Sequence, residues 1–304
     1  MAKVSILMNG YNAEKYLKEA LDSVYSQTYQ NWEIIFIDNC STDGTKKIID
    51  EYDDKIKYYK TPENLSLCSA RVFAKSFIKG DFFCVLDCDD IWLSTKLEKQ
   101  VDFMFEHKDV GIIYTNTVYF TDSGNEVLAY DRLMPSGNLF TQLLSNYFFS
   151  LETVMVRKET MDFHNIYFSP KYNVSSDAEL FIKLSYFTKC LYIDEPLAKW
   201  RYGHGSESDR GLCLFPYEYE LLLRDLSSLI DNFEAKYKNE IRSLKNKINN
   251  MYGICHWNKL ELKKAREYFF KAMKNDKKYY IPYFMSFLVD YKFYKKLRKK
   301  LTKI

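Results

Sequence analysis

The segment Phe82–Trp92, FFCVLDCDDIW, joins a short apolar run to three closely spaced carboxylates. Its first half has the composition of a buried strand, because aromatic and β-branched residues favour strands. Its second half carries Asp87, Asp89 and Asp90, which repel one another unless a positive group lies among them. Asp87 and Asp89 project to the same side of an extended chain. Two such carboxylates are suitable oxygen ligands for Mg²⁺ or Mn²⁺.

Two other interpretations of this segment are open. Three carboxylates also suit a solvated turn in which one Asp caps the following helix. Cys84 and Cys88 invite a thiolate–metal site, but the chain has no CxxC pair and its four histidines are far apart in the sequence. We therefore expect a structural role for both cysteines. Seven cysteines at irregular spacing also argue against a disulfide framework.

Composition limits the class of protein. The chain has 304 residues, 47% hydrophobic and 28% charged, which suits a soluble globular protein with one large domain or two modest ones. The longest apolar run near the end, Tyr279–Val289, has 11 residues, whereas a membrane-spanning helix needs about 20. The first twelve residues predict a strand rather than a signal peptide. A cytoplasmic location is therefore expected.

Charge is unevenly distributed along the chain. Residues 261–304 hold 14 Lys and Arg against 4 Asp and Glu, which leaves 30 against 37 in residues 1–260. The acidic body argues against a nucleic-acid partner. The basic tail, YKFYKKLRKKLTKI, has interleaved apolar residues and suits an anionic membrane surface as well as a solvated helix.

Strands and helices are predicted to alternate through the first 110 residues. Four apolar runs predict buried strands, at Val4–Met8, Ile34–Ile37, Ile56–Tyr59 and Phe82–Leu86. Helical patterns lie between them, after a predicted N-cap at Asn12, over Thr45–Tyr52 and over Ser69–Lys79 with Gly80 at the end. This order is typical of a mostly parallel α/β sheet with helices on both faces.

Ligands of such sheets bind outside the carboxyl ends of the strands. That rule selects Asn9–Gly10–Tyr11, Asp38–Asn39 and Asp87–Asp90. We expect these three groups to border one crevice.

The remaining residues are predicted in less detail. A helix is expected over Ser94–His107, then two strands joined by a turn at Asp122–Gly124. Asp177 lies at the start of a further helix, and an all-helical pattern begins near Pro216, including one tetratricopeptide-like unit.

Separate motifs then occur in a recognisable order: Tyr11–Asn12, Asp38 with Ser41–Thr42–Asp43, Ala70–Arg71, Asp87–Cys88–Asp89 and the late Asp177. In this order they resemble the family 2 glycosyltransferases, a large inverting group with the GT-A fold. The resemblance covers roughly residues 3–210. It implies a GT-A domain over 1–210, with a nucleotide-sugar half over about 1–110 and an acceptor half over about 111–210. A helical region over 216–304 follows.

The resemblance implies roles for the donor-binding residues. Tyr11 would pack on the nucleotide base, and Asp38 would accept a hydrogen bond from it, which favours uridine. Asp87 would contact the ribose or the metal, and Asp89 would ligate Mn²⁺ or Mg²⁺. Arg71 would lie near the nucleotide, although Val72 and Cys68 depart from the family pattern. A core aromatic at Tyr11 and a surface ion pair at Arg71 are the alternatives.

The resemblance also implies the groups that complete the reaction. Asp177 would be the base that removes the acceptor proton, with Glu179 in reserve, although a helix cap is the alternative for Asp177. Arg201 would neutralise a phosphate and His204 would complete the metal shell, in a loop that carries an additional Gly203.

The sequence therefore predicts a metal-dependent inverting glycosyltransferase. Its donor would be a nucleotide sugar, with UDP favoured, and its acceptor a glycan or a lipid-linked saccharide in surface polysaccharide assembly. A peripheral position on the inner face of the membrane follows if the tail binds lipid. The alternatives are a haloacid dehalogenase-type phosphatase, which also uses Asp-x-Asp at a strand end, and a catalytically degenerate nucleotide-sugar-binding protein.

Overall fold

The computed structural model describes residues 2–203, 211–274 and 276–302, and the chain divides into two compact units. The first unit comprises Met1–Phe140 and Phe148–His204, and the second comprises Thr141–Tyr147 and Gly205–Ile304. The domains predicted over residues 1–210 and 216–304 stay predictions, because compactness alone does not show that either folds by itself.

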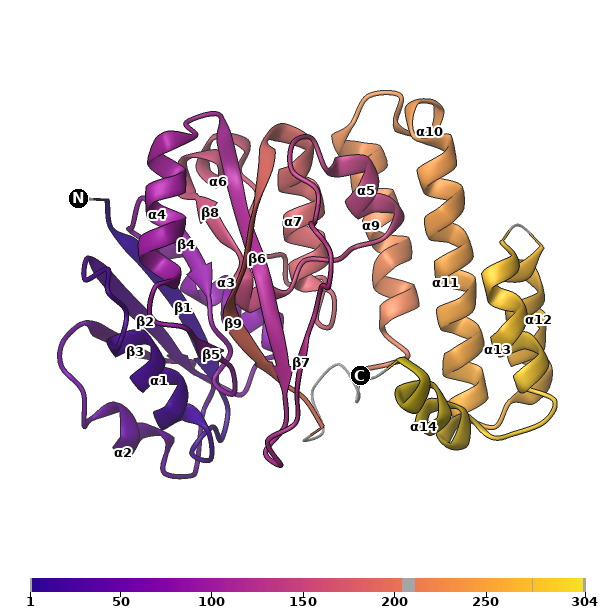
Figure 1. Ribbon diagram of the computed structural model, residues 1–304, viewed down its shortest axis with the longest axis horizontal. Helices are drawn as coiled ribbons and strands as arrows, with labels where there is room; N and C mark the ends of the chain where they lie inside the picture. Colours follow the sequence, from indigo (N-terminus) through magenta and orange to yellow (C-terminus); the bar gives the residue numbers. More distant parts are fainter. Residues whose placement is uncertain (1, 204–210, 275, 303–304) are drawn as a thin grey trace. The chain divides into compact units, whose positions relative to one another are not determined.

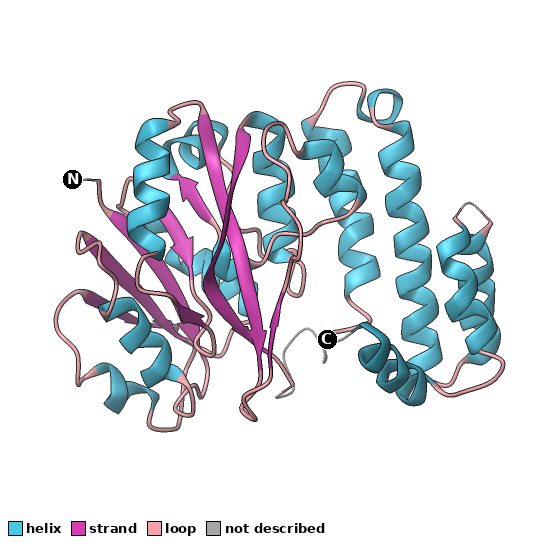
Figure 2. Ribbon diagram, viewed as in Figure 1, coloured by secondary structure: helices cyan, strands magenta, loops and turns pink. Residues whose placement is uncertain are grey.

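The first unit is built on one mixed sheet, drawn in magenta in Figure 2. Its strands are β1 (Val4–Gly10), β2 (Trp32–Asp38), β3 (Ile56–Lys60), β4 (Phe82–Val85), β5 (Ile91–Trp92), β6 (Val110–Phe120), β7 (Glu126–Leu128), β8 (Met155–Arg157) and β9 (Lys189–Arg201). Their order is β3-β2-β1-β4-β8-β6-β9-β5, with β7 paired to β6. The first four strands are parallel, whereas β8 is antiparallel to both its neighbours. The predicted parallel arrangement therefore holds for the first half, and the second half pairs in both directions.

Helices connect the strands of the first unit, as Figure 1 shows. They are α1 (Leu17–Tyr25), α2 (Thr45–Ile49), α3 (Leu67–Phe73), α4 (Lys96–Glu106), α6 (Lys158–His164) and α7 (Ser176–Phe187). Alternate strand residues, such as Ile6, Ile34 and Cys84, share one buried cluster with apolar residues of α1 and α4. Since neighbouring strand residues point to opposite faces, Leu7, Ile35 and Phe83 face the other side. The centre of the sheet is thus buried on both faces.

Asn12 does not cap α1 as the sequence predicts. The helix begins at Leu17, and Asn12 has a positive φ of 51°. Its amide oxygen accepts a hydrogen bond from Thr42 N at 2.9 Å, so the side chain joins two loops. Asn tolerates this left-handed conformation better than most residues, which explains its place there.

Gly80 does not end a long helix either. The predicted helix over Ser69–Lys79 is shorter, because α3 ends at Phe73 and a 3₁₀ turn follows over Ala74–Phe77. A Cβ on Gly80 would lie 2.6 Å from the Lys3 carbonyl oxygen. The glycine is therefore required by the close approach of two backbones.

The second unit is helical. Its helices are α5 (Phe140–Ser145), α9 (Phe215–Leu229), α10 (Phe233–Lys236), α11 (Lys238–Asn258), α12 (Leu262–Met273), α13 (Tyr280–Met285) and α14 (Tyr291–Thr302). Across the described ranges, no helix has both the length and the apolar composition to cross a bilayer.

Helices α11 and α12 form the hairpin that the tetratricopeptide-like pattern predicts. Trp257, Ala265 and Phe269 are buried together between its helices. A Cβ on Gly253 would lie 2.5 Å from the Phe269 ring, so the glycine lets the two helices approach closely. A disulfide joins Cys213 to Cys255, a pair 42 residues apart that cysteine spacing does not predict.

Candidate functional site

The carboxyl ends of β1, β2 and β4 meet at one edge of the sheet. Gly10 is paired in parallel with Asp38, and Leu7 is paired in parallel with Val85. The residues that follow these strands therefore lie at the same end, as the sequence predicts.

Arg71 of α3 lies at the centre of this edge and is only 3% exposed. Its Nη2 donates to Asp87 Oδ1 at 2.6 Å, and its Nε donates to Asn9 Oδ1 at 3.2 Å. Its Nη1 donates to Ser176 Oγ at 3.3 Å. The surface ion pair considered as an alternative is therefore excluded. One buried cation connects the end of β1, the acidic turn and the start of α7.

The three carboxylates of the acidic turn lie in different environments. The side chain of Asp87 is 35% exposed, and Asp89 is half-buried. Asp90 is buried and accepts a hydrogen bond from Arg201 N at 2.9 Å. Two carboxylates of the turn therefore reach solvent, and the third holds the end of β9.

A second buried carboxyl group lies near Asp90. Burial raises the pKa of Asp90 well above its usual range, and the neighbouring Glu152 raises it further. Burial also raises the pKa of Glu152, whose carboxylate accepts from the Ser150 hydroxyl at 2.8 Å. Burial and the repulsion between like charges therefore favour the protonated form of Asp90.

Cys88 points into the protein. Its thiol donates to the Asn9 carbonyl oxygen at 3.5 Å, and burial raises its pKa. A Cβ on Gly10 would lie 3.1 Å from the Cys88 sulfur, so this thiol fills the space beside β1. The structural role expected for Cys84 and Cys88 agrees with the burial of both.

Tyr11 and Asp38 lie beside the loop over Ser41–Asp43. Tyr11 is 54% exposed, so it is not a core aromatic. Asp38 is buried, and its two oxygens accept hydrogen bonds from Ser41 N at 2.8 Å and Tyr58 Oη at 2.5 Å. A contact from Asp38 to a base would therefore use a remaining lone pair.

Asp177 is half-buried in the first turn of α7, next to Ser176. The N-cap position belongs to Ser175, so Asp177 is not the cap residue. Glu179 is buried and pairs with Lys183 Nζ at 2.5 Å. Of the two base candidates, Asp177 is the more accessible.

Arg201 is held by groups from several elements. Its Nε donates to the Asp89 carbonyl oxygen at 2.9 Å and its Nη1 to Asp122 Oδ1 at 2.6 Å, while Nη2 pairs with Glu19. Its guanidinium carbon also lies 4.3 Å from the ring centroid of Tyr16. A phosphate would have to displace one of these carboxylates. His204, the predicted partner in the metal shell, lies outside the described residues.

The acidic turn has the carboxylates that a divalent cation requires. Asp87 and Asp89 offer oxygen donors at the edge where a diphosphate would enter. Within residues 2–203, 211–274 and 276–302, no group of three or more His, Cys, Asp or Glu side chains forms a metal cluster. The two carboxylates of Asp87 and Asp89 suit a cation that takes its other ligands from water and phosphate oxygens, as Mg²⁺ typically does.

Several contributors are not predicted by the sequence. They are Ser176, which binds Arg71, and Glu19 and Asp122, which bind Arg201. Asn9, which also binds Arg71, is one of the residues that the strand-end rule selects. No local pattern indicates the other three, because their partners lie 79 to 182 residues away.

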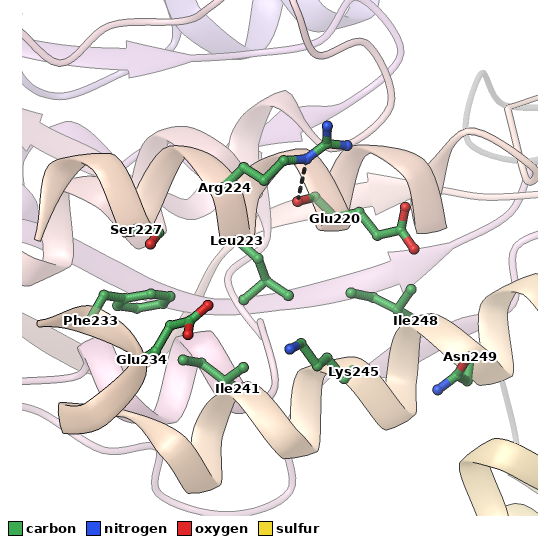
Figure 3. Close-up of a pocket in the computed structure, with 10 residues that line it drawn as sticks. All are labelled: Glu220, Leu223, Arg224, Ser227, Phe233, Glu234, Ile241, Lys245, Ile248 and Asn249. Atoms are coloured by element: carbon green, nitrogen blue, oxygen red, sulfur yellow. Dashed lines mark hydrogen bonds between the residues drawn. The ribbon is translucent and has the colours of Figure 1, made fainter.

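A separate hollow lies in the helical unit, between α9 and α11 (Figure 3). It has a volume of about 440 Å³, and its lining includes Glu220, Arg224, Glu234 and Lys245. Of the predicted site residues that the structure describes, none lines this pocket.

Comparison with known proteins assigns the fold and the family. Residues 5–168 match the family model described as Glycosyl transferase family 2. WfgD of Escherichia coli, a UDP-Glc:alpha-D-GlcNAc-diphosphoundecaprenol beta-1,3-glucosyltransferase, is 31% identical over 160 residues, 52% of this chain and 62% of WfgD. The chain spans about half to two thirds of the length of the first curated relatives it matches.

Two solved structures share the fold. TarS 1–349 of S. aureus in complex with UDP-GlcNAc has a TM-score of 0.64 and 19% identity, covering 88% of this chain and 79% of that one. The mannosyltransferase PcManGT of Pyrobaculum calidifontis, with GDP-Man and Mn²⁺, has a TM-score of 0.61 and 15% identity, covering 89% and 75%. These similarities confirm the predicted GT-A fold.

Proposed function

Because this chain belongs to glycosyl transferase family 2, we propose that it is a metal-dependent inverting glycosyltransferase with a nucleotide-sugar donor. The observation that carries the proposal is the Arg71 contact set. It places the acidic turn beside the first turn of α7, where the candidate base Asp177 lies. Family membership also argues against the phosphatase alternative.

The donor site is proposed at the ends of β1, β2 and β4. Tyr11 would pack on the base, and Asp38 would accept from it, which favours uracil. Asp87 and Asp89 would hold Mn²⁺ or Mg²⁺, which when bound offsets the negative charge of the departing diphosphate. Arg71 orients Asp87, and Arg201 holds the backbone of Asp89. The phosphate contact predicted for Arg201 stays a prediction.

Asp177 would act on the acceptor. Its carboxylate takes the proton of the acceptor hydroxyl as that oxygen bonds to the anomeric carbon of the sugar. The bond from this carbon to the diphosphate oxygen breaks, and the nucleoside diphosphate leaves with the electron pair. Attack opposite the leaving group converts an α-linked donor into a β-linked product.

The acceptor is proposed to be a glycan or a lipid-linked saccharide of surface polysaccharide assembly. The name of WfgD describes a diphosphoundecaprenol-linked acceptor, which supports this class. A basic C-terminal segment, with 14 Lys and Arg against 4 Asp and Glu in residues 261–304, supports association with an anionic membrane surface.

A donor screen tests the enzymatic proposal. The full chain is incubated with UDP-, GDP- and dTDP-sugars and Mn²⁺, and released nucleoside diphosphate is measured. We expect release from a UDP-sugar, and EDTA should suppress it. Asp177→Asn should lower the rate of this release, in which water takes the place of the acceptor hydroxyl, by about 10²-fold or more, the scale of general base catalysis. Absence of release from every donor would favour the degenerate, non-catalytic alternative.

A further inference from the structure

Helix α13 and the turn after it carry an apolar stripe that faces solvent. Ile281, Phe284 and Leu288 are 65%, 58% and 76% exposed. Their spacing of three and four residues places them on one face, and Val289 N still donates to Met285 O at 3.0 Å, so the helical turn continues. Tyr280 and Phe287, which are 42% and 52% exposed, widen the same stripe.

The opposite face of this segment fixes it to the helical unit. Pro282 and Ser286 are buried. Arg266 of α12 donates to the Ser286 carbonyl oxygen at 2.9 Å. A surface helix normally turns its apolar face inward. This segment is apolar on both sides: Tyr283 and Met285 pack on the buried cluster around Trp257, and the stripe is exposed in addition. An exposed apolar stripe on a segment fixed in this way indicates a binding partner.

The charges around the stripe identify that partner. Residues 271–298 hold eight Lys and Arg against two carboxylates. Asp276 is paired with Lys278 at 2.8 Å, and Asp290 accepts from Phe293 N at 2.8 Å. Lys274 lies 5.6 Å from the Phe270 ring, which in turn contacts Tyr283. The apolar stripe is therefore embedded in a segment with excess positive charge.

We propose that this stripe, Tyr280–Leu288, inserts into the interface of an anionic lipid bilayer, with the basic residues of 271–298 on the lipid headgroups. Apolar side chains beside Lys and Arg are the usual composition of an interfacial anchor. A second copy of the chain fits less well, because pairing two such faces would bring two positively charged segments together. This proposal rests on the membrane association proposed above. It assigns the apolar part of the membrane anchor to α13 and the turn after it, and not to the terminal tail.

Vesicle cosedimentation of the full chain tests this inference. The vesicles are phosphatidylcholine alone, or phosphatidylcholine mixed with phosphatidylglycerol. We expect binding to the mixed vesicles, weakened by salt, and the triple variant Ile281→Gln, Phe284→Gln, Leu288→Gln should bind at least about tenfold more weakly, since it loses the apolar part of the anchor. Phe163→Gln is the matched control, because Phe163 is 82% exposed in the other unit, and its binding should equal that of the unsubstituted chain.

A second variant keeps the test valid if the triple variant misfolds. Phe284→Trp places an indole on the stripe, and its emission should shift to shorter wavelength when mixed vesicles are added, whereas Phe163→Trp should show no shift. Equal vesicle binding by the triple variant and the unsubstituted chain would overturn the proposal. The proposal would also be overturned if the unsubstituted chain did not bind vesicles and sedimented as a dimer, while the triple variant sedimented as a monomer.

Donor turnover separates this inference from the enzymatic proposal. The stripe variant should release nucleoside diphosphate at the rate of the unsubstituted chain in the absence of vesicles. Vesicle binding through the stripe without any donor turnover would contradict the enzymatic proposal alone. Donor turnover without vesicle binding would contradict this inference alone.

Discussion

Two buried arginines contact the acidic turn after β4, one through a side chain of the turn and the other through its backbone. Arg71 binds the side chain of Asp87, a predicted donor-binding residue. Arg201 binds the backbone of Asp89, and its charge is balanced by Glu19 and Asp122. Arg71 therefore fixes the position of a carboxylate proposed to bind the metal, whereas Arg201 joins three parts of the scaffold. A buried cation near a site is informative only once its partners are known.

The largest effect is expected at Arg71. Arg71→Ala should lower donor turnover by about 10²-fold or more, because Asp87 loses its orientation, and should lower the free energy of unfolding by about 1–3 kcal/mol. Arg71→Lys keeps the charge but cannot reproduce three directed hydrogen bonds, so it should recover stability better than turnover. Steady-state kinetics and urea unfolding measure the two effects. Full turnover in Arg71→Ala would exclude a role in the site.

A smaller loss of turnover is expected at Arg201. Arg201→Ala should lower the free energy of unfolding by about 1–3 kcal/mol, because a buried side chain and its hydrogen bonds are lost. Turnover should fall by about tenfold, through displacement of Asp89. Steady-state kinetics and urea unfolding again measure the two effects. A loss of turnover as large as that of Arg71→Ala, with unchanged stability, would indicate that Arg201 contacts the donor.

The smallest effect concerns pH. The hydrogen bond from Tyr16 and the pairing with Arg201 lower the pKa of Asp122 to about 2. A carboxyl group with a lowered pKa stabilises the fold above its unfolded pKa of about 3.9, and this contribution is lost as pH falls toward 2. The difference in melting temperature between the unsubstituted chain and Asp122→Asn should therefore shrink between about pH 4 and pH 2. A difference in melting temperature that stayed constant between pH 4 and pH 2 would contradict the lowered pKa of Asp122.

The sequence predicts the positions of the first four strands well, and β1, β2 and β4 are fully buried, as their apolar composition indicates. In β3 only Ile56 is buried, because this strand lies at the edge of the sheet. The sequence also predicts which residues follow these strands, and hence Asp38, Asp87 and Asp89. The sequence-based prediction is wrong where a residue contacts a part of the chain that is distant in the sequence. Asn12 joins two loops instead of capping α1, and Gly80 accommodates a neighbouring backbone instead of ending a helix.

The contacts that assemble the site lie beyond local patterns. Ser176 binds Arg71 across 105 residues, and Glu19 binds Arg201 across 182. Such pairs form only when the sheet brings distant elements together. The family resemblance could place Asp177 in the reaction, but only the structure shows that its neighbour Ser176 reaches Arg71.

Binding calorimetry tests the central claim, that Asp87 and Asp89 form a metal-dependent diphosphate site. UDP is titrated into the full chain with Mn²⁺ and, separately, with EDTA, and both titrations are repeated with Asp89→Asn. We predict that Mn²⁺ strengthens UDP binding to the unsubstituted chain and that Asp89→Asn abolishes this gain. If Mn²⁺ strengthened UDP binding equally in both proteins, Asp89 would not hold the metal, and the proposed diphosphate site would be contradicted.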